Sequence, residues 1–268
     1  MGSKNRISKY IAPIIQSYID KNHIINYLEP FVGGGNMIDK IHCDNKYGSD
    51  IDNILIALFK HLQNGGELIP EEKITFELYK KAREDYKNKN YTNFTEWELG
   101  CIGWLSSWGG KGFQGGFSRP KNGKFRYKEG CINILKQMPN LMDVHFSCCD
   151  YKEWDKLFNE GKLNNYMIYC DIPYENTTKY GNNINFNYNE FWNIMRKWST
   201  KNIVLISEFN APNDFECIWS KEIINQINLS NKENRDVKKV KNIEKLFKKL
   251  NEHRRIIGRY YHDIEYDD

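Results

Sequence analysis

Short apolar runs alternate with amphipathic segments along most of this chain. Five segments carry apolar residues at helical spacing and predict helices, at residues 10–19, 51–63, 75–87, 95–107 and 186–200. Short apolar and aromatic runs predict buried strands at residues 24–28, 144–148, 167–170 and 203–207, and residues 46–49 form a less regular one. Strands that alternate with helices in this way predict an α/β fold with a mainly parallel sheet.

One predicted strand ends on the turn Asp171-Ile172-Pro173-Tyr174. At the carboxyl end of a strand in an open α/β sheet, side chains project into the crevice where ligands bind. Asp171 can accept a hydrogen bond from an amino group, and Pro173 has no N–H, so the Ile172 carbonyl is held outward. Tyr174 offers a flat face for stacking. These features suit chemistry on a planar amine, but an Asp-X-Pro sequence is also common in plain turns.

A second loop, Gly33-Gly34-Gly35, follows the first predicted strand. We expect Asn36 to cap a short helix after it, whose free N–H groups would face an anion or a polar ligand. Asp50 lies 17 positions after Gly33, where an acid holds a nucleotide ribose in Rossmann-like units. The glycine spacing disfavours a dinucleotide or a phosphate-binding loop, so a nucleoside with a short zwitterionic tail fits better. The alternative is a simple tight turn.

The regular alternation of strands and helices is interrupted between residues 64 and 140. A glycine-rich stretch at residues 109–128 interleaves cations with aromatic residues, as a nucleic-acid surface does, where cations meet phosphates and rings stack on bases. The alternative is a solvated loop whose aromatics pack into the core. The candidate DNA-binding cations are Lys111, Arg119, Lys121, Lys124 and Arg126. We therefore predict an inserted region at residues 64–140 within a domain formed by residues 1–63 and 141–268.

Composition narrows the class of protein. The net charge of +4 conceals a strongly basic region at residues 231–259, which permits a nucleic-acid partner without requiring one. Its lysine-rich part, residues 231–252, is interpreted as a solvated face or a DNA contact. No apolar run is long enough to span a bilayer. Seven cysteines and six scattered histidines show neither a disulfide framework nor zinc-ligand spacing, which favours a reducing cytoplasm.

Together these motifs resemble the Dam-like, adenine-specific DNA methyltransferases of bacteria and phages. The likeness rests on residues 29–35, Glu-Pro-Phe-Val-Gly-Gly-Gly, followed by the turn at residues 171–174. Gly2-Ser3-Lys4 is similar to the N-terminal cofactor motif of the family, and the places of the other motifs are occupied by Asp50, Asp150 with Tyr151, and Ser207 with Glu208. The order also matches: cofactor loop, inserted region, then catalytic strand.

The resemblance implies a Rossmann-like S-adenosylmethionine-dependent methyltransferase sheet with an inserted, mostly helical target-recognition region. It implies methyl transfer to the 6-amino group of adenine at a specific site in double-stranded DNA, without a metal and with a restriction endonuclease as a potential partner. The implied catalytic residues are Asp171, Ile172, Pro173 and Tyr174. The implied donor-binding residues are Lys4, Phe31, Gly33, Gly35, Asp50, Asp150 and Asp171.

One residue departs from the family pattern, because the family usually has proline where Ile172 stands. Two alternatives therefore stay open. The same geometry would serve methylation of the exocyclic amine of cytosine. A DNA-binding protein that kept the fold and lost catalysis is the alternative from another class.

Overall fold

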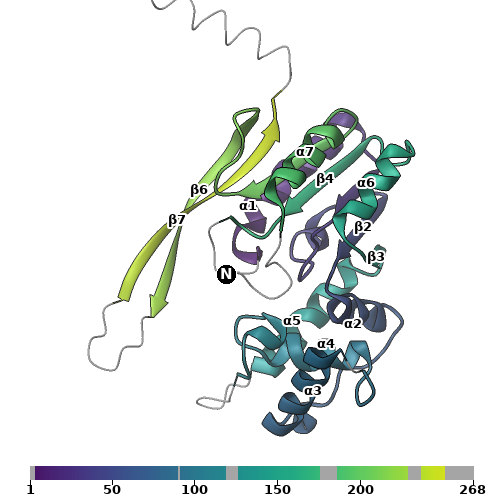
Figure 1. Cartoon of the computed structure of the whole chain (residues 1–268), viewed down its shortest axis with the longest axis vertical. Helices are drawn as coiled ribbons and strands as arrows, with labels where there is room; N and C mark the ends of the chain where they lie inside the picture. Colours follow the sequence, from purple (N-terminus) through teal and green to yellow (C-terminus); the bar gives the residue numbers. More distant parts are fainter. Residues whose placement is uncertain (1–3, 90, 119–125, 176–185, 229–236, 251–268) are drawn as a thin grey trace, which may run out of the picture.

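The computed structural model describes residues 4–89, 91–118, 126–175, 186–228 and 237–250 (Figure 1). Seven strands in these residues form one sheet with the order β3-β2-β1-β4-β5-β7-β6. Neighbouring strands from β3 to β5 pair in parallel, and β7 pairs antiparallel with both β5 and β6. The strand bounds are β1 Asn26–Glu29, β2 Asn45–Asp50, β3 Val144–Cys148, β4 Tyr166–Asp171, β5 Ile203–Glu208, β6 Phe215–Asn228 and β7 Val237–Lys249. The predicted α/β fold is confirmed.

All five predicted helices are present, within a few residues of their predicted ends. The helices are α1 Asn5–Asn22, α2 Asn53–Gln63, α3 Phe76–Asn88, α4 Glu96–Ser106, α5 Arg126–Gln137, α6 Tyr151–Asn159 and α7 Tyr188–Trp198. Helices α5 and α6 were not predicted from the sequence. Helix α5 buries only Tyr127 and Ile134, so its apolar stripe is short, whereas α6 carries a readable stripe in Tyr151, Trp154 and Phe158.

The sheet is buried on both faces, as a parallel sheet requires. Successive residues of β4 point to opposite faces: Met167 and Tyr169 join one apolar cluster, and Ile168 and Cys170 join the other. The first cluster contains residues of α1, α2 and the helices of the inserted region, and the second contains residues of α6 and α7 (Figure 1). The near-continuous apolar run of β4 follows from this double burial.

Helix α4 of the inserted region packs closely on α2. A Cβ atom added at Gly100 would lie 2.2 Å from the Ile54 carbonyl oxygen, so glycine is required for this approach. Leu99 and Ile102 of α4 share the first apolar cluster with Ile54 and Leu58 of α2. Helix α4 is therefore built onto the same core as the sheet.

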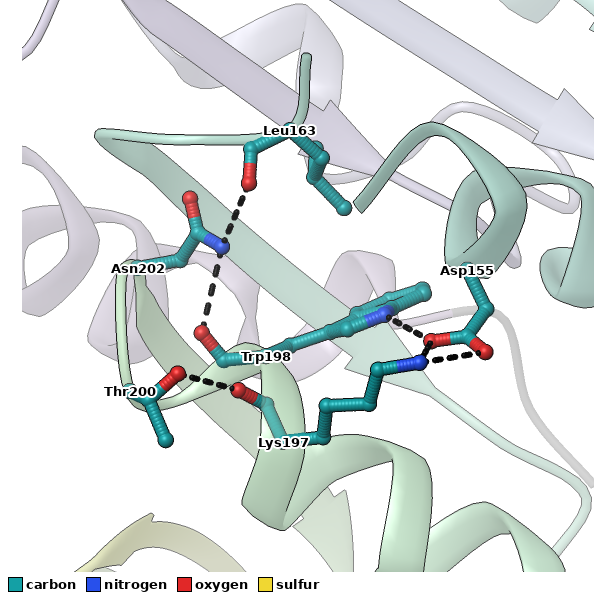
Figure 2. Close-up of polar contacts among 6 residues, drawn as sticks. All are labelled: Asp155, Leu163, Lys197, Trp198, Thr200 and Asn202. Atoms are coloured by element: carbon teal, nitrogen blue, oxygen red, sulfur yellow. Dashed lines mark hydrogen bonds and ion pairs between the residues drawn. The ribbon is translucent and has the colours of Figure 1, made fainter. Parts of the chain in front are cut away.

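A polar network anchors the end of the sheet at which β4 begins (Figure 2). The Asn202 side-chain amide donates to the carbonyls of Leu163 and Trp198, at 3.2 and 3.1 Å, and its oxygen accepts from the Tyr166 N–H at 2.9 Å. Nearby, Asp155 accepts from the Trp198 indole N–H at 3.0 Å and pairs with Lys197 at 2.8 Å. These contacts fix the start of the strand that carries Asp171 at its other end.

The structure corrects the expectation for the segment after the glycine loop. Only a 3₁₀ turn, Ile38–Lys40, forms there, with Met37 rather than Asn36 in the capping position and no side-chain cap. Three residues are too few for an α-helix, so the proposed helix N-terminus does not exist. Any ligand at this loop must be held by other groups.

Part of the basic tail forms a strand that was not predicted from the sequence. Residues 237–249 are strand β7, which lies between β5 and β6 and buries Leu246 and Phe247, and the two interpretations of its lysines, a solvated face and a DNA contact, stay predictions. Apolar residues are sparse in this strand, and only its last part, Lys245–Lys248, pairs with β5. A lysine-rich strand therefore escaped a search for apolar periodicity.

Candidate functional site

Four neighbouring parallel strands each end on an acidic residue. These residues are Glu29 of β1, Asp50 of β2, Asp171 of β4 and Glu208 of β5. Parallel strands place their carboxyl ends at the same edge of the sheet, where ligands of open α/β folds bind. The acids predicted from the sequence therefore gather along one edge.

Asp171 pairs with Lys4, which immediately precedes α1. The Lys4 Nζ lies 3.1 Å from Asp171 Oδ1, and the two side chains are 11% and 29% exposed, respectively. Burial raises the pKa of Asp171, while the Lys4 ammonium opposes this shift. Asp171 is thus a partly accessible hydrogen-bond acceptor at the strand end, and the structure brings it together with Lys4.

Tyr174 lies beside this ion pair and is almost fully buried. Its hydroxyl donates to Glu244 Oε2 at 2.6 Å, and Lys4 contacts the same hydroxyl. The Lys4 Nζ also lies 4.4 Å from the centroid of the tyrosine ring, while Phe209 packs against the ring edge-to-face at 4.6 Å. The sequence analysis missed Glu244, although it is the only acid in the lysine-rich segment Val237–Lys249.

Packing and one hydrogen bond hold the turn between Asp171 and Tyr174. The Ile172 side chain is 3% exposed and belongs to the second apolar cluster. The Pro173 carbonyl accepts a hydrogen bond from the Tyr188 hydroxyl at 2.8 Å. These contacts restrain the turn without a proline at position 172.

Glu208 supports the same turn from β5. The side chain is 3% exposed, and Oε1 accepts from the Glu175 N–H at 3.2 Å. The other oxygen, Oε2, is buried and has no hydrogen-bond partner among the described residues. Burial raises the pKa of Glu208 to about 7, so its charge changes near neutral pH.

Asp50 organises the glycine loop at the end of β2. Its two oxygens accept from the backbone N–H groups of Gly33 and Asp52, each at 3.0 Å. Gly33 and Gly35 have φ of +47° and +67°, a region that other residues adopt only with strain. Burial raises the pKa of Asp50 despite these backbone donors.

A cavity of about 250 Å³ opens beside this loop. It lies between the sheet edge and the inserted region, and its lining includes Gly33, Asp50, Asp52, Trp104 and Lys111. A Cβ atom added at Gly33 would meet nothing within 4 Å, so the backbone there faces open space. An open cradle with a half-buried acid suits the hydroxyl groups and ring of a nucleoside.

Phe31 and Asp150 lie at neighbouring positions along the same edge. The Phe31 ring contacts Tyr151, with 5.2 Å between centroids, as well as Phe186 and Phe191. Asp150 is exposed and caps α6 by accepting from the Lys152 N–H at 2.9 Å. An aromatic surface next to an exposed carboxylate suits a planar ring that carries an amino group.

The cations that were predicted to bind DNA lie in different surroundings. Arg119, Lys121 and Lys124 lie outside the described residues, as do Gly2 and Ser3 of the N-terminal motif. Lys111 lines the cavity beside Asp50, whereas Arg126 is exposed with its guanidinium 4.5 Å from the ring centroid of Trp108, which is 45% exposed.

The aromatic residues of this stretch have a structural role where they are described. Phe113 and Phe117 pack against Tyr79, with centroids 5.3 and 5.2 Å apart. Tyr127 is 1% exposed, and its hydroxyl donates to the Ile69 carbonyl at 2.5 Å. For these rings, packing into the core is the correct interpretation.

Three further features bear on the chemistry. All seven cysteines are free thiols. No group of three or more His, Cys, Asp or Glu side chains within the described parts of the chain is arranged to hold a metal ion. No helix in those parts has both the length and the apolar character needed to cross a membrane.

Comparison with known proteins identifies one family. Residues 1–255 match the model of a family described as D12 class N6 adenine-specific DNA methyltransferase. The chain is also similar to the Type II methyltransferase M.MjaIII of Methanocaldococcus jannaschii, with 26% identity over 204 residues, which covers 66% of this chain and 68% of that relative. The family match includes the glycine loop, the inserted region, all strands of the sheet and the turn at residues 171–174.

Proposed function

Because the chain belongs to the D12 class of N6 adenine-specific DNA methyltransferases, we propose that it transfers the methyl group of S-adenosylmethionine to the 6-amino group of adenine at a specific site in double-stranded DNA. The observation that carries this proposal is the grouping of Asp171, Lys4 and Tyr174 at the carboxyl end of β4, beside the cradle at Gly33 and Asp50. A partly accessible acceptor next to an aromatic ring suits the edge and the face of a purine.

The deciding experiment measures the product. Purified protein is incubated with unmethylated DNA and isotopically labelled donor, and the DNA is digested to nucleosides for mass spectrometry. Labelled N6-methyl-2′-deoxyadenosine is expected. Labelled N4-methyl-2′-deoxycytidine would establish the cytosine-amine alternative, and the absence of label would support the binding-only alternative. Sequencing of the modified bases then gives the recognition site.

The donor-binding residues suit the donor's chemistry. S-adenosylmethionine supplies an electrophilic methyl group on a positively charged sulfur. The Asp50 carboxylate, already fixed by two backbone N–H groups, lies where ribose hydroxyls can donate to it. The half-buried Phe31 ring, packed on Tyr151, offers aromatic surface beside Asp150, which can accept from an adenine amino group. Lys4 can pair with the carboxylate of the amino-acid tail.

The catalytic turn acts on the target amine through two acceptors. The lone pair of an exocyclic adenine amine is delocalised into the ring, which makes it a poor nucleophile. Hydrogen bonds to the Asp171 carboxylate and the Ile172 carbonyl favour the tetrahedral amine and free its lone pair. The nitrogen gains positive charge as it attacks, so these preplaced acceptors stabilise the transition state more than the ground state.

The base must leave the duplex to reach this turn. Extrusion costs a few kcal/mol. The Tyr174 ring is 8% exposed with Lys4 over one face, so stacking on it requires a neighbouring side chain to move, and it then offsets about 1–3 kcal/mol of this cost. We assign target recognition to the inserted region at residues 64–140, where Arg126 and Trp108 form an exposed pair of a cation and an aromatic ring. Such a pair can meet a phosphate and a base together.

Asp50→Asn should weaken donor binding more than it slows saturated turnover. The substitution keeps one acceptor oxygen but removes the charge, and a hydrogen bond to a charged group is worth about 1.5–3 kcal/mol, or roughly 10- to 100-fold in Kd. Because this contact is expected to be equal in the ground and transition states, kcat should change little. Calorimetric titration of the donor measures the effect, with the exposed Asp44→Asn as the matched control. An unchanged Kd removes Asp50 from the donor site.

Ile172→Pro should leave turnover within roughly tenfold, or about 1.4 kcal/mol in barrier height. The reaction needs the carbonyl of this residue, which both amino acids supply, and Pro173 already restricts position 172 to extended geometry. The buried Ile172 side chain adds packing that proline supplies only in part. Steady-state kinetics on DNA give the comparison. An inert natural protein whose activity appears in Ile172→Pro would establish the binding-only alternative.

Lys111→Ala and Arg126→Ala should have separable effects. Lys111 lines the cavity beside Asp50, so its loss should weaken donor binding several-fold and leave DNA affinity unchanged. Loss of Arg126 should lower the slope of log DNA affinity against log salt by about 0.9, the value for one phosphate contact. Both variants are titrated with donor and with DNA at several salt concentrations. If Lys111→Ala alters the salt slope instead, Lys111 is a DNA-binding residue.

A further inference from the structure

Glu244 reaches the catalytic turn from the opposite end of the chain. Strand β7 pairs with β5 from Lys245 to Lys248, and Lys245 lies opposite Glu208. Glu244, the residue before Lys245, therefore lies just beyond the end of this pairing. Its side chain is 18% exposed and contacts two residues of the site. Oε2 accepts from the Tyr174 hydroxyl at 2.6 Å and lies 3.1 Å from Lys4 Nζ.

The bond between Glu244 and Tyr174 fixes the far end of the tyrosine ring. A hydroxyl that donates to a carboxylate at 2.5–2.7 Å forms a strong, charge-assisted hydrogen bond. Burial raises the pKa of Tyr174, and the carboxylates of Asp171 and Glu244 raise it further, so the hydroxyl keeps the proton that it donates. A swing of the ring away from Asp171 takes place about the Cα–Cβ bond and would carry the hydroxyl away from Glu244. With its hydroxyl bound, the ring cannot swing away from Asp171.

The need for a counter-ion to Lys4 does not explain why a carboxylate is present at position 244. Lys4 already has a counter-ion in Asp171, at the same distance of 3.1 Å. The second carboxylate acts against the reaction electrostatically, because it adds to the effect of burial in raising the pKa of Asp171, whose ionised form is the better acceptor. The remaining role for Glu244 is to accept the hydrogen bond that fixes the position of the Tyr174 hydroxyl.

We propose that Glu244 is a positioning residue for methyl transfer, which holds the Tyr174 ring through its hydroxyl in the orientation in which the extruded base stacks. This inference rests on the proposed function. Glu244 acts through Tyr174 and does not itself touch the substrate. A tyrosine that is free to rotate would still bind the base but would present it to Asp171 in a range of orientations.

The test combines four variants, Glu244→Ala, Glu244→Gln, Tyr174→Phe and the double variant Glu244→Ala/Tyr174→Phe. Glu244→Ala should lower kcat roughly 10- to 100-fold, the scale of a small misplacement of the reacting group, with KM for DNA and donor within twofold. Tyr174→Phe should cause a similar loss, because it removes the same hydrogen bond. Glu244→Gln keeps an acceptor for the hydroxyl and should stay within threefold of the natural protein.

The double variant shows whether Glu244 acts through the Tyr174 hydroxyl or through Lys4. If Glu244 acts through the Tyr174 hydroxyl, the double variant is no slower than Tyr174→Phe alone, because coupled residues are non-additive. Additive losses would mean that Glu244 acts through Lys4 and would overturn the inference. Unchanged kcat in Glu244→Ala would overturn it as well. Glu222→Ala, an exposed acid on the adjacent strand, is the matched control and should leave kcat unchanged.

Two further results keep the inference distinct from folding and from the proposed function. Thermal melting shows whether each variant is folded. Should Glu244→Ala fail to fold, Tyr174→Phe and Glu244→Gln still decide: a slow phenylalanine variant with an active glutamine variant supports the inference, and an active phenylalanine variant refutes it. If the natural protein transfers no methyl group to DNA, the proposed function fails. If the natural protein and Glu244→Ala are equally active, only the positioning role fails.

Discussion

Asp171→Ala is expected to lower kcat at saturating DNA and donor by at least roughly 10²–10³-fold, the cost of removing one preorganised group that stabilises developing charge. The variant loses the carboxylate that accepts from the target amine and is left with the backbone carbonyl of Ile172. KM for both substrates should change less than kcat, because the contact strengthens as the nitrogen becomes positive. Single-turnover transfer of labelled methyl groups measures the chemical step directly.

The fold of this variant should persist. The Asp171 side chain is 29% exposed and lies at a strand end, so its loss opens no apolar cavity. The pKa of Asp171 in the folded protein is raised, so the folded state releases this proton at a higher pH than the unfolded chain does. Between the two pKa values stability therefore falls as pH rises, and above both values the ionised Asp171 costs stability. Asp171→Asn should accordingly melt no lower than the natural protein at neutral pH.

The same shift predicts the acid side of the pH–rate profile. The reaction needs the carboxylate, so kcat should fall as pH drops through a pKa higher than that of an ordinary aspartate. In Asp171→Asn this limb should disappear together with most of the activity. Full activity in Asp171→Ala would refute the proposed mechanism.

The sheet was largely predictable because its central strands are buried on both faces. Tyr166–Asp171 and Ile203–Glu208 carry near-continuous apolar runs, so their positions follow from the sequence almost residue by residue. Strand β7 was not predictable in this way, because most of its length pairs only with β6 and needs few apolar residues. Helix α5 was missed for the same physical reason: it buries two side chains along twelve residues.

The site residues that could be predicted from the sequence are the acids at the ends of strands. Asp171 ends an apolar strand and Asp50 ends a less regular one, and their places at one edge of a parallel sheet follow from topology alone. The partners of these acids depend on distant parts of the chain. Glu244 approaches Tyr174 across 70 residues of sequence, and Lys111 lines the same cavity as Asp50 because α4 packs on α2. No local pattern encodes such contacts.

Trp198→Ala is expected to lower the free energy of unfolding by about 3–5 kcal/mol, the range for truncating a buried aromatic side chain. Trp198 is fully buried in the apolar cluster that also contains Ile168 and Cys170 of β4. Its removal leaves a cavity behind the strand that carries the catalytic turn, and it also removes the indole donor to Asp155 (Figure 2).

The partners of Trp198 define the control variants. Asp155 keeps its ion pair with Lys197 when the indole is lost, so no unpaired charge is created and the cost is that of the cavity and one hydrogen bond. Trp198→Phe refills much of the volume and should fall between the natural protein and Trp198→Ala. Thr200→Ala removes only an exposed hydroxyl bond to the Lys197 carbonyl and should cost within about 0.5 kcal/mol, as surface substitutions do.

Urea unfolding at equilibrium, followed by tryptophan fluorescence and circular dichroism, measures these differences as shifts of the midpoint at constant slope. A midpoint for Trp198→Ala that equals that of Thr200→Ala would show that α7 does not support the sheet. A large shift would show that Trp198 supports strand β4. Because Ile168 and Cys170 lie just before Asp171 in this strand, the position of Asp171 should then depend on the same packing. Under conditions where Trp198→Ala is still folded, its kcat should then fall further than that of Thr200→Ala.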